Sequence, residues 1–348
     1  MKQLQDYITA IQPIDVKRRK AVAEHWNAIA KPLHGMGLLE TDVERILAIL
    51  GSTRQLRKCI AVMCADNGVV REGVTQTDSS VTAIVAANMT KGDATVCNMA
   101  KVAGADVYIY DVGMNSDVKG TIARKAAYGT CNLYEQDAMT GEQAVQTVLA
   151  GIQIAGELKQ QGYHLIASGE MGIGNTTTSS AVASVLLQQL PEVVTGYGAG
   201  LTHAALLHKT EIIRTAIQRR NPDKDNPMEI LAKLGGFDIA AMCGLFLGGA
   251  YYQIPIVIDG LISSVAAVLA KRMCPAAADY MLASHLSAEP AAALLMRELQ
   301  LTPPIQCHMA LGEGTGAVAW MPMLDMALQV YYNMPTFAQT NIEEYKPL

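Results

Sequence analysis

Two glutamates, each framed by glycines, are the residues of this chain best suited to chemistry. Glu170 lies in Gly-Glu-Met-Gly-Ile-Gly-Asn-Thr-Thr-Thr, residues 169–178, and Glu313 lies in Gly-Glu-Gly-Thr-Gly, residues 312–316. The flanking glycines allow a ligand and the backbone to approach closely. Backbone N–H groups beside them can bind an anion at a helix N-terminus. The pattern predicts a negatively charged substrate with a base placed beside it.

The stretch around Glu170 indicates a phosphate-binding turn rather than a known nucleotide loop. It lacks the Gly-Lys-Ser/Thr ending of a Walker loop and does not match Gly-x-Gly-x-x-Gly. What remains is a glycine-rich turn that leads into a threonine-rich helix start, where N–H groups could bind a monophosphate. The alternative is a plain strand-to-helix turn capped by Thr176 or Thr177, which would use the same N–H groups. The spacing leaves both interpretations open.

Two further polar positions could complete such a site. A glycine cluster ends at Gly200 and is followed by Lys209, which could supply a cation or be a solvated surface charge. An apolar run ends at Asp259, as in enzymes that use phosphoribosyl pyrophosphate, but Gly260 replaces their second acid. Because no metal-binding constellation is evident either, any phosphoribosyl donor is expected to be something other than the pyrophosphate, and no metal is predicted. Asp259 could bond ribose hydroxyls or cap the following helix.

Composition excludes several classes of protein. Half of the 348 residues are hydrophobic and the net charge is −5 with no basic block, which argues against nucleic-acid binding. The N-terminus shows no signal peptide, and seven scattered cysteines without a Cys-x-x-Cys pair indicate buried thiols in a reducing cytoplasm. Residues 239–258 carry no charge, but glycines, tyrosines and a proline interrupt them, so a buried helix, a turn and a strand are expected rather than a membrane span.

Short apolar runs alternate with longer segments rich in alanine, leucine, methionine and valine. The runs of strand length are 59–65, 106–110, 163–167, 254–258, 280–283 and 309–311, and the helical segments include 80–102, 141–161, 176–190, 288–299 and 318–332. Continuous apolar strands separated by helices predict an α/β fold with a mostly parallel sheet buried on both faces. In such sheets, ligands bind outside the carboxyl ends of the strands.

Both ends of the chain differ from this alternating body. Residues 41–50 repeat apolar residues at helical spacing, and Thr41 followed by Glu44 fits a capping box. We expect residues 1–50 and 333–348 to form a small helical lobe beside a large α/β domain, residues 51–332.

In their order along the chain, these motifs resemble the nicotinate-nucleotide–dimethylbenzimidazole phosphoribosyltransferases of cobalamin assembly. The similarity covers nearly the whole chain and rests on residues 65–70, 72–74, 80–82, 169–177, 234–238, 258–260, 284–289 and 311–316. It implies a dimeric, Rossmann-like α/β enzyme without a cofactor. Such an enzyme transfers the 5-phosphoribosyl group of nicotinate mononucleotide to 5,6-dimethylbenzimidazole and yields α-ribazole 5′-phosphate and nicotinate.

The resemblance also assigns roles to individual residues. Glu313 falls on the family's catalytic base, and Glu170 on its second active-site glutamate. The positions expected to contact substrate are Ser80, Gly174, Asn175, Thr176, Thr177, Gly200, Lys209, Asp259, Ser287, Gly312 and Gly314, with the phosphate-binding turn at 174–176.

The implied reaction makes chemical use of both glutamates. The unprotonated benzimidazole nitrogen attacks C1′ from the face opposite nicotinate, so the β donor gives an α product. Glu313 would take the proton from the other ring nitrogen, and Glu170 could stabilise the oxocarbenium-like ribosyl centre. Nicotinate departs from a pyridinium, so bond cleavage neutralises its ring and needs no metal.

One departure from the family pattern concerns the acceptor. Asn67 stands where many relatives carry histidine, and residues 75–80 lie near the acceptor side, so other benzimidazoles, purines or phenols are alternative acceptors. Two other functions are competing hypotheses. A dinucleotide-dependent dehydrogenase lacks its Gly-x-Gly-x-x-Gly signature here. A nucleotide-binding sensor or subunit without turnover would have no need of Glu313.

Overall fold

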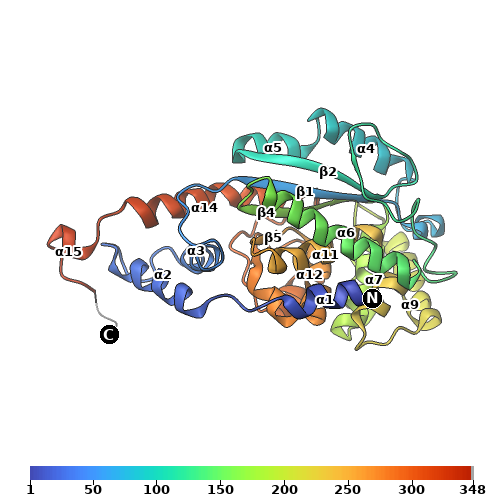
Figure 1. Cartoon of the computed structure of the whole chain (residues 1–348). Helices are drawn as coiled ribbons and strands as arrows, with labels where there is room; N and C mark the ends of the chain where they lie inside the picture. The colour runs from blue at the N-terminus through green and yellow to red at the C-terminus, as the bar shows by residue number, and fades with distance from the viewer. Residues whose placement is uncertain (346–348) are drawn as a thin grey trace.

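A six-stranded sheet forms the centre of the structure, a computed structural model that describes residues 1–345 (Figure 1). The strands are β1 (Lys58–Ala65), β2 (Ala105–Gly113), β3 (Ile122–Ala123), β4 (Leu165–Met171), β5 (Ile256–Ile258) and β6 (Met281–Ala283). Their order is β3-β2-β1-β4-β5-β6, and every pairing is parallel. The predicted α/β fold with a mostly parallel sheet is confirmed.

Helices supply the crossovers that parallel strands require. They are α1 (Lys2–Ala10), α2 (Val16–Ala28), α3 (Leu38–Leu50), α4 (Ser80–Lys91), α5 (Thr95–Ala103), α6 (Gly141–Gln160), α7 (Asn175–Leu187), α8 (Pro191–Val194), α9 (His203–Arg220), α10 (Pro227–Leu234), α11 (Phe237–Tyr251), α12 (Leu261–Met273), α13 (Ala292–Leu299), α14 (Thr315–Asn333) and α15 (Phe337–Thr340). Two short 3-10 helices are η1 (Gly68–Glu72) and η2 (Pro275–Tyr280). The predicted helix, turn and strand over 239–258 are confirmed as α11 and β5.

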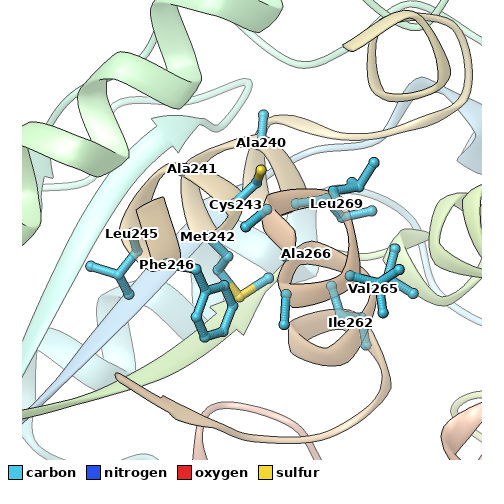
Figure 2. Close-up of a cluster of buried hydrophobic side chains, with 14 of the residues drawn as sticks. Ala240, Ala241, Met242, Cys243, Leu245, Phe246, Ile262, Val265, Ala266 and Leu269 are labelled. Atoms are coloured by element: carbon cyan, nitrogen blue, oxygen red, sulfur yellow. The ribbon is translucent and has the colours of Figure 1, made fainter. Parts of the chain in front are cut away.

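Both faces of the sheet are buried, as the apolar strands predict. Along β1, Cys59, Ala61 and Met63 belong to one hydrophobic cluster, with α6, α11 and α12. The alternate residues Ile60 and Val62 belong to a second cluster, with α3, α5 and α14. Figure 2 shows the first cluster where the side chains of α11 meet those of α12. The two clusters hold the strand ends in fixed positions beneath the loops that follow them.

The terminal segments pack in two places. Trp26 of α2 and Tyr331 near the end of α14 lie edge to face, with ring centroids 5.0 Å apart, and α2, α3 and α15 lie at one end of the molecule (Figure 1). In contrast, Leu4 of α1 belongs to the hydrophobic cluster of α6 and α11. The boundaries of the small lobe at residues 50 and 333 stay a prediction.

The expected strand at 309–311 is wrong. These residues form a loop in which Leu311 is 52% exposed, and Gly312 turns the chain with φ +87°. Only one backbone bond, from the N–H of Ala288 to the carbonyl of Met309, joins this segment to the chain after β6 within the described backbone. A short apolar run before a glycine turn therefore misled the strand assignment.

Two helix predictions need correction. The segment 80–102 is two helices, because Gly92 adopts φ +82° and ends α4. Thr41 does not cap a helix: α3 begins at Leu38, and the Thr41 hydroxyl donates to the Leu38 carbonyl inside its first turn.

The structure also tests the expected burial of the cysteines and the absence of a membrane-spanning helix from the described residues. Five cysteines are buried as expected, whereas Cys131 and Cys307 are exposed, and all seven are unpaired in the part of the chain described. Within residues 1–345, every helix is too short or too polar to traverse a bilayer.

Candidate active site

A cavity of about 220 Å³ opens at the carboxyl ends of β4 and β5. Beside it, between β1 and β4, the chain order reverses, because β1 pairs with β2 on one side and with β4 on the other, and such switch points leave a crevice for ligands. Three loops contribute to its walls: residues 74–77, residues 197–199 with Leu201, and residues 310–313. The two glutamates predicted to do chemistry both line this cavity.

Glu170 lies at the end of β4, 8% exposed. The side-chain amide of Asn175 donates to its Oε2, and the backbone N–H of Glu313 also bonds its carboxyl group. Burial, together with the nearby carboxylates of Asp238 and Asp259, raises the pKa of Glu170 to about 8. In the free protein near pH 7, Glu170 is therefore mainly protonated.

Glu313 lies at the tip of a tight turn. Its backbone adopts φ +61°, between Gly312 at +87° and Gly314 at +92°. This left-handed path explains the glycines, and a Cβ at position 312 would collide with the carboxyl group of Glu170. The Glu313 Oε2 atom accepts a hydrogen bond from the N–H of Val96 at 3.0 Å, in the first turn of α5. This bond orients the half-buried carboxylate at the cavity wall.

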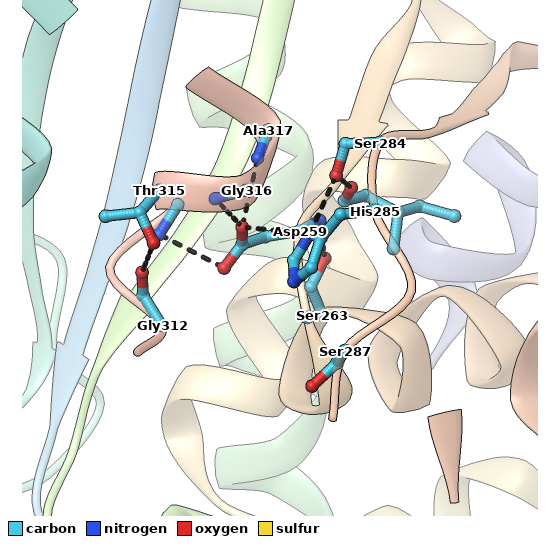
Figure 3. A network of polar contacts seen from close by, with 12 residues as sticks. Asp259, Ser263, Ser284, His285, Ser287, Gly312, Thr315, Gly316 and Ala317 are labelled. Carbon is cyan, nitrogen blue, oxygen red and sulfur yellow. Dashed lines mark hydrogen bonds and ion pairs between the residues drawn. The ribbon is translucent and has the colours of Figure 1, made fainter. Parts of the chain in front are cut away.

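Asp259 holds the turn that contains Glu313 (Figure 3). Its Oδ1 accepts from the N–H groups of Gly316 at 2.8 Å and Ala317 at 3.1 Å, and its Oδ2 from that of Gly314 at 3.2 Å. Asp259 therefore caps α14, not the helix that follows it in sequence, and its burial raises its pKa against the opposing effect of His285. Asp259 also lines the cavity, where it can contact a bound ligand.

A cationic end of the cavity lies at the N-terminus of α7. Lys209 of α9 is 1% exposed, and its Nζ donates to the Thr176 hydroxyl at 2.9 Å and to the Gly196 carbonyl at 3.3 Å. Burial lowers the pKa of Lys209 to about 8, opposed by the charge of Glu289. The surface-charge interpretation of Lys209 is thus wrong. So is the threonine cap, because α7 begins at Asn175 after Gly174 in a left-handed conformation.

The structure brings most of the predicted site residues to one cavity. Its walls include Glu170, Gly174, Asn175, Thr176, Lys209, Asp259, Ser287, Gly312 and Glu313. Four predicted contacts lie outside the lining. Thr177 is fully buried, Gly314 directs its N–H to Asp259, Ser80 is exposed at the start of α4, and the Gly200 carbonyl accepts from the side chain of Gln76.

Sequence reasoning missed much of the cavity wall. Val74, Gln76, Met171, Ile173, Tyr197 and Leu311 line it. Several lie inside the predicted motifs, such as Met171 and Ile173 in 169–178 and Leu311 in 311–316, but as uncharged side chains they were given no role. Tyr197 is the aromatic phenol of the wall, 49% exposed at the mouth. Residues 1–345 hold no cluster of three or more histidine, cysteine, aspartate or glutamate side chains arranged to ligate a metal.

Comparison with known proteins first gives the class to which this fold and site belong. A family model described as phosphoribosyltransferase matches residues 11–342. Nicotinate-nucleotide–dimethylbenzimidazole phosphoribosyltransferases of Ruminiclostridium cellulolyticum and Clostridium acetobutylicum are each 42% identical to this chain over 99% of both partners. A crystal structure of CobT from Thermus thermophilus superposes with a TM-score of 0.88 at 35% identity, covering 94% of this chain and 100% of that one.

The chain belongs to the nicotinate-nucleotide–dimethylbenzimidazole phosphoribosyltransferase family. The resemblance inferred from its motifs is confirmed over nearly the full length. The dehydrogenase and sensor alternatives find no support among these relatives.

Proposed function

We propose that this protein transfers the 5-phosphoribosyl group of nicotinate mononucleotide to 5,6-dimethylbenzimidazole or a related base in cobalamin biosynthesis. The products are α-ribazole 5′-phosphate and nicotinate. The observation that supports this most strongly is the meeting of Glu170 and Glu313 in one cavity, with a buried lysine at its other end. Family membership supports the same reaction.

The donor phosphate is proposed to bind at the α7 end of the cavity. The N-terminus of α7 is the positive end of that helix, and a phosphate there would meet Lys209, which lies 2.9 Å from the Thr176 hydroxyl. Ser287, 8% exposed, lines the same cavity and can donate its hydroxyl. Because Lys209 is desolvated before the substrate arrives, its attraction to an anion is stronger than that of a surface lysine.

Glu313 is the proposed general base. Attack by one nitrogen of the acceptor on C1′ places positive charge on the acceptor ring, and proton transfer from the other nitrogen to Glu313 removes it. The Val96 N–H binds Oε2, which leaves Oε1 available for the acceptor. The uncharged wall around Leu311 and Ile173 suits a flat aromatic ring.

Glu170 is proposed to stabilise the ribosyl centre. The C1′ carbon becomes positively charged as the bond to nicotinate breaks, while the nicotinate ring loses its own positive charge. A carboxylate in a cavity shielded from water stabilises that charge more than one in bulk water. Holding donor and acceptor face to face supplies further acceleration.

A homodimer in the cytoplasm is the proposed form of the protein. Leu311 and Tyr197, at the mouth of the cavity, are 52% and 49% exposed, and a second copy could cover this apolar rim. The unpaired cysteines fit a reducing compartment.

The test is an assay of the purified protein with nicotinate mononucleotide and 5,6-dimethylbenzimidazole, with products resolved by chromatography and mass. Equal amounts of ribazole phosphate and nicotinate are expected. Glu313→Gln should reduce the rate by about 10²–10⁴-fold, the usual contribution of a general base. Glu135→Gln, an exposed glutamate far from the motif, is the matched control. Nucleotide binding without product for any benzimidazole, purine or phenol would refute the proposal.

A further inference from the structure

Asp238 is a buried carboxyl group next to the active site that the proposed mechanism does not use. It lies in the first turn of α11 and is 0% exposed. Its Oδ1 accepts from the N–H of Ile239 at 2.9 Å, and the side chains of Asn67 and Asn175 also stabilise its ionised form by hydrogen bonds. A fully buried carboxyl group close to a second one, Glu170, is costly to ionise, which calls for a functional explanation.

The surroundings of Asp238 connect it to Glu170. The side chains of Asn67, after β1, and Asn175, at the start of α7, face the Asp238 carboxylate. The amide of Asn175 also donates to Glu170. A Cβ at Gly172 would collide with both Asp238 and the carbonyl of Ala65, so the chain after β4 passes directly over this group. Asn175 therefore lies between two buried carboxyl groups.

The charges that face Glu170 are almost all negative. Asp238 on α11 and Asp259 after β5 are carboxyl groups, and Asn175 and the N–H of Glu313 are neutral donors. Burial and the nearby charge of Glu170 raise the pKa of the Cys64 thiol of β1. No cationic side chain of residues 1–345 is among the groups that shift the pKa of Glu170. His285 is directed at Asp259, and Lys209 at Thr176.

We propose that Asp238 is a positioning residue that, together with Asn175, couples binding of the donor's pyridinium ring to release of a proton from Glu170. The inference rests on the proposed function, because the cation that this site lacks is the pyridinium ring of the donor. When that ring binds, the Glu170 O–H bond breaks, the proton passes to solvent and the carboxylate faces C1′. The free protein thereby avoids holding two adjacent buried anions.

The pKa directions agree with this geometry. Burial raises the pKa of Asp238 to about 6, with Asn67, Asn175 and its backbone partners lowering it, and it raises the pKa of Glu170 to about 8. Near pH 7, Asp238 is thus mainly ionised while Glu170 keeps its proton. Removal of the Asp238 charge would lower the pKa of Glu170 and make its proton easier to lose before the donor arrives.

Proton release can be measured by titration calorimetry at pH 7 in buffers of different ionisation enthalpy. The two ligands are nicotinate mononucleotide and ribose 5-phosphate, which share the phosphate but not the pyridinium charge. Any proton uptake at Lys209 is common to both ligands. The difference in the number of protons released therefore measures the effect of the nicotinate ring. The mononucleotide should release up to about one more proton per site than ribose 5-phosphate.

In Asp238→Asn, the pH at which mononucleotide binding releases most protons should fall by about one pH unit, since one negative charge near Glu170 is removed. Asp66→Asn is the matched control, because Asp66 is buried beside Asn67 but is not among the groups that shift the pKa of Glu170. It should leave the release unchanged. Equal shifts in both variants would overturn the role of Asp238.

A wild-type measurement keeps the inference testable if Asp238→Asn does not fold. Between pH 6 and pH 8, affinity for the mononucleotide should rise about tenfold per pH unit relative to ribose 5-phosphate. Binding of the mononucleotide with no extra proton release would overturn this inference and leave the proposed reaction standing. Failure of the mononucleotide to bind at any pH would overturn both.

Discussion

The Oε2 atom of Glu313 lies 3.0 Å from the backbone nitrogen of Val96, although 217 positions separate the two residues. The bond joins the turn before α14 to the first turn of α5, where helix N–H groups have no partner within the helix. The proposed base thus also acts as a helix cap, because its carboxyl oxygen accepts one of these N–H groups.

This double role predicts that activity and stability separate at position 313. Glu313→Gln keeps an oxygen that can accept from Val96, so it should lose activity but little stability. Glu313→Ala loses the acceptor as well and should reduce the free energy of unfolding by about 1 kcal/mol, the usual effect of a lost cap. Urea denaturation of both variants measures the difference. Equal unfolding free energies for the two would contradict a capping role.

Glu170 is predicted to make the stability of the protein fall as pH rises. Its pKa is about 8 in the folded protein, above the ordinary value of 4.5, so the folded state binds one proton more between these values. The stability that the Glu170 proton contributes is therefore fully present below pH 4.5 and is lost as the pH rises through 8. Glu170→Gln should be more stable than wild type at pH 8 by roughly 2–4 kcal/mol, with little difference near pH 5.

Urea denaturation at pH 5, 6.5 and 8 checks this prediction. Glu135→Gln, an exposed control, should follow the wild type at every pH. A stability gain in Glu170→Gln that does not change with pH would show that burial of the charge is not its cause.

Lys209 is predicted to weaken donor binding when the pH rises above about 8. Its pKa is lowered to about 8 by burial, so the free protein loses this positive charge above pH 8. A phosphate favours the charged form, and the KM for nicotinate mononucleotide should rise above that pH. Lys209→Met should raise KM by about ten- to hundredfold, because a hydrogen bond to a charged group is lost. Lys224→Met, in an exposed loop, is the control.

A second donor distinguishes phosphate binding from a structural role of Lys209. Nicotinate riboside lacks the phosphate, so its turnover by the wild type and by Lys209→Met should be similar. An equal loss with both donors would show that Lys209 supports the fold of the site and not the phosphate.

The sequence predicted those features that depend on local pattern. Continuous apolar runs around 59–65 and 163–167 indicated buried parallel strands, because only a sheet covered on both faces can bury every side chain. Glu170 could be placed at a strand end for the same reason. Asn175 was assigned from the same motif to the phosphate-binding turn, and its bond to Glu170 was not predicted.

Contacts between distant segments could not be predicted in this way. Nothing near Val96 indicates that its N–H binds Glu313, and α5 itself was hidden within one long helical prediction that Gly92 divides. Asp259 was expected to bond ribose hydroxyls or to cap the next helix, whereas the start of α14 lies beside the end of β5 and supplies its hydrogen-bond donors. Such pairings depend on the order of the strands in the sheet, which the pattern of residues along one sequence does not specify.

Asp259 offers the sharpest test of how the turn at Glu313 is held. Its carboxylate accepts three backbone N–H groups at the start of α14, all buried. Asp259→Ala should therefore reduce the free energy of unfolding by about 3 kcal/mol, through the lost cap and the unpaired N–H groups. Asp259→Asn keeps Oδ1 as an acceptor for Gly316 and Ala317 and should lose about half as much. Asp225→Ala, in an exposed loop, should change stability by less than about 0.5 kcal/mol.

The same variants distinguish a role of Asp259 in holding this turn from the contact with ribose hydroxyls that the sequence suggested. If it holds the turn, Asp259→Ala should lower kcat because Glu313 is misplaced, and Asp259→Asn should recover part of the rate. If it binds ribose hydroxyls instead, KM for the donor should rise while the unfolding free energy stays near that of the wild type. The three backbone hydrogen bonds favour the first outcome. Without the carboxylate, these buried N–H groups would lose their acceptor, and a turn this closed leaves no room for water to take its place.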